Sequence, residues 1–158
     1  MNEFVDSLKE FMFAYNLNNL QLSKLLGISS TAVNGYFNYG YLPNIQTAIK
    51  MCDIFDCSLD YLFGLSDNTR SEYPLDCNTA LDNFIQNIDN LIKENKLSIA
   101  HTMKELQLDE YTYYHWKHGK MPKTNNVIAI AKYFGVSIDF LMGNSQTTNH
   151  SSTCALQY

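Results

Sequence analysis

The heptapeptide SLDYLFG, residues 58–64, is followed 79 residues later by SIDFLMG, residues 137–143. Both copies begin with a serine that can cap a helix, and both place an aspartate in the first turn, where the helix dipole favours negative charge. A leucine then faces a core and a glycine ends the helix. An interval of this length is too long for a solenoid repeat and suits a small domain. The heptapeptides therefore predict two copies of one helical domain, and they belong to its scaffold rather than to a site.

The repeat extends well upstream of the heptapeptides. Between residues 40 and 64, eight residues recur at the same offset: Gly40/Gly119, Pro43/Pro122, Ile49/Ile128, Phe55/Phe134, Ser58/Ser137, Asp60/Asp139, Leu62/Leu141 and Gly64/Gly143. Before this stretch the best offset is 80, so the first copy carries one extra residue near its third helix.

Apolar spacing and capping residues predict five helices in the first copy. They are a helix over residues 3–15, a second capped at Asn18 and Asn19 and stopped by Gly27, a third from Ser29 or Ser30 to about Phe37, a fourth capped by Asn44, and a fifth from Ser58 to Gly64. The inward positions expected for the fourth helix are Ile45, Ala48, Ile49, Cys52 and Phe55.

The second copy repeats this order. Its helices are expected to be capped by Thr79, Ser98, Asp109 and Ser137, the third running to about His118 and the last ending at Gly143. The buried residues expected in its fourth helix are Val127, Ile128, Ala131 and Phe134. These elements place the first domain at residues 1–66 and the second at residues 80–145. Residues 67–79 lack helical periodicity and are expected to form a linker, and the polar residues 146–158 a flexible tail.

Composition excludes several classes of protein. An apolar content of 46% can fill a core, and a charged content of 17% is low for a disordered chain. No apolar run reaches about 18 residues, so no membrane partner is expected. The acidic start MNEFVDSLKE does not resemble a signal peptide. The four cysteines show no CxxC spacing, which favours reduced thiols and a cytoplasmic location.

Charge is unevenly distributed along the chain. The net charge of −5 argues mildly against a nucleic-acid partner. Residues 1–66, however, carry three Lys or Arg against six Asp or Glu, whereas residues 80–158 carry seven against seven and all four histidines. If the protein has a basic surface that attracts nucleic acid, it is therefore expected in the second copy.

Three stretches carry a resemblance to a known family. Residues 18–43, NNLQLSKLLGISSTAVNGYFNYGYLP, combine a capped helix, a turn glycine and a second helix, and residues 97–122, LSIAHTMKELQLDEYTYYHWKHGKMP, end in Gly-x-x-Pro. Residues 48–68, AIKMCDIFDCSLDYLFGLSDN, look like the last two helices of such proteins. The chain thus resembles the Cro/repressor-type, or XRE, helix-turn-helix family. The resemblance implies an all-α fold of two tandem five-helix lambda-repressor-like DNA-binding domains.

The resemblance also implies a function. It predicts a sequence-specific transcription regulator, a repressor of bacterial or phage origin, whose partner is double-stranded operator DNA. The third helix of each copy would enter the major groove while the start of the second helix meets a phosphate. Two half-sites about 34 Å apart would be reached either by a homodimer or by a pseudo-dimer within one chain.

The family pattern assigns roles to residues of the first copy. The phosphate-facing positions are Asn18 and Asn19, and the base-facing positions are Ser30, Thr31, Asn34 and Gly35. Asn34 can make bidentate hydrogen bonds to adenine. Tyr36, Phe37, Tyr39 and Tyr41 crowd the turn where binders place cations. Two interpretations are open: either Tyr36 and Phe37 are partly core while Tyr39 and Tyr41 lie on the surface, or the aromatic cluster is a protein-contact patch.

In the second copy the phosphate-facing position is Ser98. The base-facing positions are Glu110, Tyr111, Tyr114 and His115; Glu110 is repelled by phosphates but can accept from cytosine N4. A basic group that can clamp the backbone consists of Lys117, His118, Lys120 and Lys123. The alternative for this group is a solvated turn, and Trp116 is expected in the core.

Other chemistry finds little support. The HxxH pair His115 and His118 lacks further ligands, so no metal is expected, and no motif indicates an enzyme or a cofactor. The rival class is a protein-interaction module, such as an antirepressor or a regulator subunit, that keeps the fold without strong DNA binding. A mixed case, with one copy on DNA and the other dimerising, also stays open.

Overall fold

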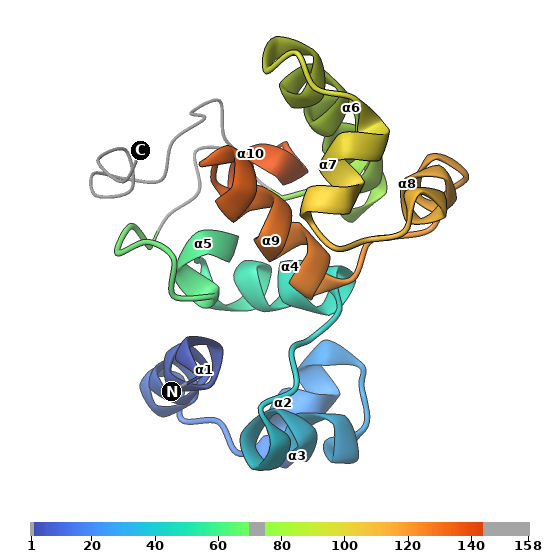
Figure 1. Cartoon of the computed structure of the whole chain (residues 1–158). Coiled ribbons are helices and arrows are strands. Elements are labelled where there is room, and N and C mark those ends of the chain that lie inside the picture. The colour runs from blue at the N-terminus through green and yellow to red at the C-terminus, as the bar shows by residue number, and fades with distance from the viewer. Residues whose placement is uncertain (1, 70–74, 144–158) are drawn as a thin grey trace. The chain divides into compact units, whose positions relative to one another are not determined.

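The computed structural model describes residues 2–69 and 75–143, and all regular structure within them is helical. The chain divides into two compact units, unit 1 (Met1–Arg70) and unit 2 (Ser71–Tyr158), each of which holds five helices in its described part (Figure 1). The predicted tail and the middle of the predicted linker lie outside the described residues.

The five helices of unit 1 follow the predicted order. They are α1 (Glu3–Ala14), α2 (Asn19–Leu26), α3 (Ser30–Tyr39), α4 (Ile45–Phe55) and α5 (Leu59–Leu62). Helix α3 runs two residues beyond the predicted end at Phe37, because Gly40 takes the left-handed conformation (φ 68°) that closes it. The N–H of Gly40 donates to the carbonyl of Tyr36 at 3.1 Å, which satisfies one of the last carbonyls of the helix.

Each of the helices α2 to α5 begins at a polar side chain that accepts a backbone N–H. The cap residues are Asn18, Ser29, Asn44 and Ser58. At Asn18 the bond is reciprocal, since the Gln21 side chain accepts the Asn18 N–H in return. A cap of this kind contributes about 1 kcal/mol, so local sequence alone accounts for most helix starts in this unit.

A core joins all five helices of unit 1. Helix α1 packs against α5, and α2 packs against α3 and α4. The Phe4 ring meets the Tyr36 ring edge-on at 5.6 Å between centroids, which ties α1 to α3. The five inward positions predicted for α4 are all buried. This packing leaves the opposite face of α3 free.

Unit 2 repeats the arrangement with a longer first helix. Its elements are α6 (Cys77–Glu94), α7 (Ile99–Glu105), α8 (Glu110–Lys117), α9 (Thr124–Phe134) and α10 (Ile138–Met142). The prediction that Thr79 caps the first of these was wrong: Asp76 caps it by accepting the N–H of Asn78 at 2.9 Å. The caps predicted at Ser98, Asp109 and Ser137 are confirmed.

Trp116 lies in the core of unit 2, buried as predicted, and meets Phe84 edge-on at 5.2 Å. Two inward positions predicted in α9 are corrected, because Ile128 and Phe134 are only half-buried. Ile130 is fully buried instead, together with the predicted Val127 and Ala131. The buried edge of α9 is thus rotated by part of a turn from the edge that the repeat suggested.

Two asparagines of α6 fasten the end of α10. The Asn87 amide donates to the carbonyls of Phe140 and Leu141 at 2.8 and 3.2 Å, and the Asn83 amide donates to that of Met142 at 3.3 Å. Carbonyls in the last turn of a helix lack the usual partner four residues on, and these amides supply donors there in addition to the N–H of Gly143, which donates to Phe140. The bonds fix the position of α6, on which α8 also packs.

Candidate nucleic-acid interface

Helix α3 has one buried and one exposed side. Val33 and Tyr36, the fourth and seventh residues of the helix, are buried in the core of unit 1. The residues on the other side of the helix, Ser30, Thr31 and Asn34, are exposed. The structure therefore places three of the predicted base-facing residues on one outward surface, the α3 face.

A hydrogen bond links this face to the start of α2. The Asn19 amide donates to the Asn34 side-chain carbonyl at 2.9 Å. The bond holds the Asn34 amide in one orientation and leaves its NH2 group directed away from Asn19. Asn18 does not take part, because its side chain caps α2 through Gln21. Asn19 thus lies beside Asn34, whereas Asn18 shapes the helix start.

Gly35, the remaining base-facing position expected in the first copy, is excluded by packing. It is buried, and a Cβ at this position would lie 3.0 Å from the Tyr41 ring. Tyr41 thus covers Gly35 and closes the C-terminal half of the α3 face.

The tyrosines that follow α3 divide into two kinds. Tyr36 is 6% exposed, and burial raises the pKa of its hydroxyl, so it is core and its assignment to a contact patch was wrong. Tyr39 and Tyr41 are 72% and 62% exposed, with ring centroids 5.4 Å apart. The aromatic patch beside α3 therefore consists of two side chains rather than three.

Helix α8 has the same two sides as α3. Its fourth and seventh residues, Tyr113 and Trp116, are buried. The exposed residues, which form the α8 face, are Glu110, Tyr111, Tyr114 and His115. Tyr111 is 72% exposed, and Tyr114 is 44% exposed because its ring meets Tyr113 edge-on. All four predicted base-facing residues of the second copy thus share one surface.

A group of exposed basic side chains follows α8. His118 contacts the carbonyl of Tyr114 through Nδ1 at 2.7 Å, and the N–H of Lys120 donates to the carbonyl of His115 at 3.0 Å, so the turn is well fixed. Lys123 is exposed at the start of α9. Within residues 2–69 and 75–143, neither Lys120 nor Lys123 forms an ion pair. Their charges face solvent.

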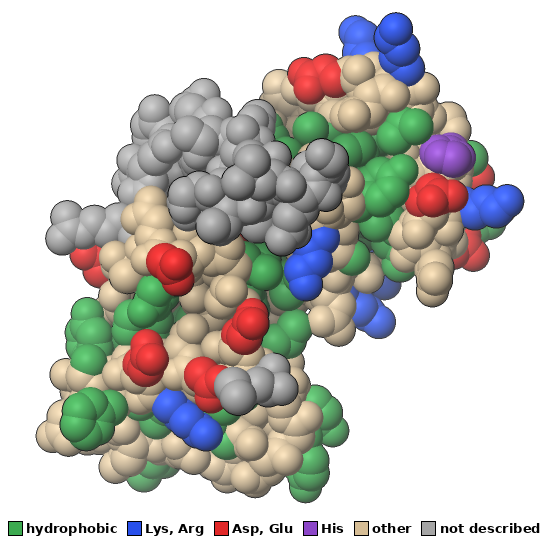
Figure 2. Space-filling model, turned by 60° about the vertical axis from the view of Figure 1, so that its left-hand side comes forward, with side chains coloured by type: hydrophobic (Ala, Val, Ile, Leu, Met, Phe, Trp, Pro, Cys, Tyr) green, Lys and Arg blue, Asp and Glu red, His purple; other side chains and the backbone are tan. Residues whose placement is uncertain are grey.

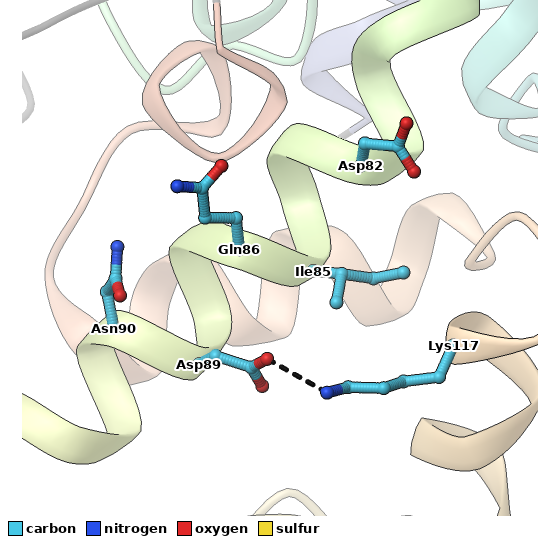
Figure 3. A pocket seen from close by; sticks show the side chains of 6 residues that line it. All are labelled: Asp82, Ile85, Gln86, Asp89, Asn90 and Lys117. Carbon is cyan, nitrogen blue, oxygen red and sulfur yellow. Dashed lines mark ion pairs between the residues drawn. The ribbon is translucent and has the colours of Figure 1, made fainter.

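Lys117 departs from the prediction that it belongs to this basic group. Its ammonium forms an ion pair with Asp89 of α6 at 3.1 Å (Figure 3). It also lies 5.3 Å from the centre of the Tyr113 ring. Interaction with the Tyr113 hydroxyl and with the Asp89 carboxylate raises the pKa of Lys117 to about 12. The Lys117 charge is therefore paired with Asp89 of α6 in this structure, unlike the charges of Lys120 and Lys123.

The partner of Lys117 was not foreseen from the sequence. Asp89 accepts a hydrogen bond from the Tyr113 hydroxyl as well as the ion pair. Burial and this bond raise the pKa of Tyr113. No local pattern marks Asp89, since the contact joins residues 24 positions apart. An open pocket beside it is lined by Asp82, Ile85, Gln86, Asp89, Asn90 and Lys117 (Figure 3).

Ser98 lies at the start of α7, where its hydroxyl accepts the N–H of His101 at 3.1 Å. Like Asn18 in unit 1, it shapes the helix start rather than offering a free side chain. The backbone N–H groups of the first turn remain directed outward, as at any helix N-terminus.

The units differ in surface charge. In Figure 2 the charged side chains on the visible face of unit 1 are mostly acidic, whereas most of the visible Lys side chains belong to unit 2, where acidic side chains also lie. This contrast follows the uneven distribution of charge along the sequence. Among the described residues, no helix is long and apolar enough to span a membrane, and no cluster of three or more His, Cys, Asp and Glu could hold a metal ion.

Comparison with known protein families gives two matches. A helix-turn-helix family matches residues 8–62, and a helix-turn-helix domain family matches residues 85–145. No curated protein and no solved structure gives a match. The chain is therefore a tandem helix-turn-helix protein of the Cro/repressor, or XRE, type, and at the general level a DNA-binding regulator.

Proposed function

We propose that the protein is a repressor that binds operator DNA through the α3 face and the α8 face. The observation that carries the proposal is the exposure of matching outward positions on both third helices, each backed by two buried residues. Such a helix offers its polar residues to base edges while its core side stays fixed.

The α3 face supplies direct readout. Asn34 can donate to adenine N7 through its amide while its carbonyl accepts from N6, and a carbonyl oxygen has two lone pairs, one of which Asn19 uses. Ser30 and Thr31 add small donors and acceptors at the start of the helix. The exposed start of α2 at Asn18 and Asn19 is offered to a phosphate.

Unit 2 supplies most of the attraction to the backbone. Lys120, Lys123 and His118 lie just after α8, where a backbone clamp is useful, and the start of α7 at Ser98 faces a second phosphate. Unit 1 has no comparable group near α3 in its described part. Because one chain carries both units, contact by one raises the local concentration of the other. Occupied promoter DNA would be closed to transcription.

The test is fluorescence anisotropy of the full chain with DNA fragments from its own gene neighbourhood at several salt concentrations. We expect saturable binding that weakens steeply with salt. The variant Lys120→Ala should lower the slope of log affinity against log salt by about 1. Lys93→Ala, an exposed lysine at the end of α6, is the matched control and should leave the slope unchanged. Absence of binding at about 50 mM salt would refute the proposal.

A second candidate function is favoured by Tyr39 and Tyr41. Their exposed, adjacent rings lie where a DNA-binding protein would carry cations, and they present an aromatic surface there instead. Unit 1 would then contact a protein while unit 2 alone binds DNA. In that case Asn34→Ala leaves DNA affinity unchanged, whereas replacing Tyr39 and Tyr41 by serine abolishes association with the partner.

A further inference from the structure

The α3 and α8 faces occupy equivalent positions but carry different chemistry. Ser29 and Asp109 are the N-caps, so Ser30 and Glu110 are the first residues of α3 and α8. Counted from these residues, the fourth and seventh positions are buried in both helices. The first, second and fifth residues therefore correspond. The corresponding outward pairs are Ser30/Glu110, Thr31/Tyr111 and Asn34/Tyr114.

In none of these three pairs do the two side chains have similar chemistry. At the first position a small hydroxyl in α3 corresponds to a carboxylate in α8. At the second, the small Thr31 corresponds to Tyr111, which is 72% exposed and so projects far from the helix. At the fifth, an amide that both donates and accepts corresponds to a phenol ring. A base pair that fits under the α3 face would thus meet a longer, more apolar surface under the α8 face.

The α8 face has its own complement in the major groove. A carboxylate only accepts, so Glu110 needs an amino group, which cytosine N4 and adenine N6 provide. The apolar ring of Tyr111 has one apolar counterpart among major-groove base edges, the C5-methyl group of thymine. By contrast, the amide of Asn34 suits adenine and has no use for a methyl group.

We propose that the operator is asymmetric, with an adenine read by Asn34 in one half-site and a thymine methyl read by Tyr111 in the other. This inference rests on the proposed DNA binding and deepens it. Operator palindromy mirrors two-fold symmetry in the protein. The covalent pair of units lacks that symmetry at every corresponding outward position, so an inverted repeat of one half-site would match one unit and mismatch the other.

The experiment is selection of the full chain on a random DNA pool, followed by affinity measurements on the selected site. We expect two dissimilar half-sites. Asn34→Ala should relax base preference by about tenfold at an adenine in one half. Replacing the critical thymine by uracil, which lacks the methyl group, should weaken binding about fourfold, the value of one buried methyl group.

Tyr111 is tested with a pair of variants. Tyr111→Ala should remove the sensitivity to uracil, and Tyr111→Phe, which keeps the ring, should retain it. Because Tyr111 is exposed, neither change disturbs the core of unit 2. Selection of an inverted repeat with identical halves, or sensitivity to uracil that survives in Tyr111→Ala, would overturn the asymmetric operator while leaving DNA binding intact. No selected site at all, with no binding at about 50 mM salt, would overturn the proposed function and this inference with it.

Discussion

At the scale of single residues, Asn34 carries the most specific chemistry of the α3 face. Its carbonyl is held by Asn19, so the amide is ordered before DNA arrives. Ordering a side chain in advance reduces the entropy lost on binding. In the proposed complex the two asparagines would therefore have different tasks, Asn34 contacting the base and Asn19 positioning Asn34.

Asn34→Ala is expected to weaken binding to the preferred DNA about tenfold and to leave non-specific binding unchanged, because phosphate contacts remain. Asn19→Ala should weaken specific binding by a smaller factor, since Asn34 is then free to rotate. Anisotropy against specific and scrambled DNA measures both effects. Gln86→Ala, an exposed amide on α6, is the control. An equal loss on both DNAs for Asn34→Ala would contradict a role in base readout.

Lys117 shows how far single-residue roles can be inferred from sequence. Its neighbours in the chain are basic and follow a recognition helix, which predicted a phosphate contact. The structure pairs it instead with Asp89, on a helix brought close only by folding. Tyr36 is a similar case, since the sequence left open whether it lies in the core or in a contact patch with Tyr39 and Tyr41, and the structure buries it. Local patterns located the outward positions well, but they could not show which side chains the fold engages.

At the scale of elements, α6 and α8 are joined by Asp89, Tyr113 and Lys117. Asp89→Asn keeps the shape but removes the charge, and should destabilise unit 2 by about 0.2–1 kcal/mol, the range for exposed ion pairs. Trp116 is the only tryptophan of the chain and is buried in unit 2, so its fluorescence follows the unfolding of that unit in urea. Asp82→Asn, on the same helix, is the control. An unchanged midpoint would show that the ion pair contributes nothing measurable.

The same contact predicts a loss of stability at high pH. The pKa values of Tyr113 and Lys117 are raised in the folded state, that of Lys117 to about 12. Folding thus favours their protonated forms, so this stabilisation is complete below about pH 10 and is lost as pH rises through the folded values. Urea midpoints from Trp116 should fall between about pH 10 and 12. The fall should be shallower in Asp89→Asn, and an identical fall in both proteins would contradict the coupling.

The start of α2 offers a test of capping in unit 1. Asn18→Ala removes one half of a reciprocal cap and should cost about 1 kcal/mol of stability, while Asn18→Asp should cost little because aspartate also caps well. Urea unfolding followed by circular dichroism measures the difference. Equal stability of the two variants would show that the cap bond seen at Asn18 is not important in solution.

Helix boundaries were predictable to the extent that caps are local. Seven caps follow from a polar residue just before an apolar run, namely Asn18, Ser29, Asn44, Ser58, Ser98, Asp109 and Ser137. Asp76 was missed because Thr79 is an equally good cap and the intervening residues show no periodicity. The inward edge of α9 was only partly predicted: Val127 and Ala131 are buried as expected, but Ile130 replaces Ile128 and Phe134, because the rotation of α9 depends on how it packs against α10. Propensity determines where helices start, and packing determines how they are rotated.

At the scale of the whole molecule, the central question is whether both units engage DNA together. If they do, binding of the second unit is intramolecular, and DNA with both half-sites should bind at least 100-fold more tightly than DNA with one half-site scrambled. The measurement is anisotropy on two fragments of equal length, which keeps non-specific binding constant. Scrambling the half-site read by α3 in the Asn34→Ala variant should then cost less than in the unaltered protein, because that contact is already lost. Equal affinity for both fragments would mean that only one unit binds DNA, and since unit 2 holds the basic turn, unit 1 with Tyr39 and Tyr41 would be left as the part available to a protein partner.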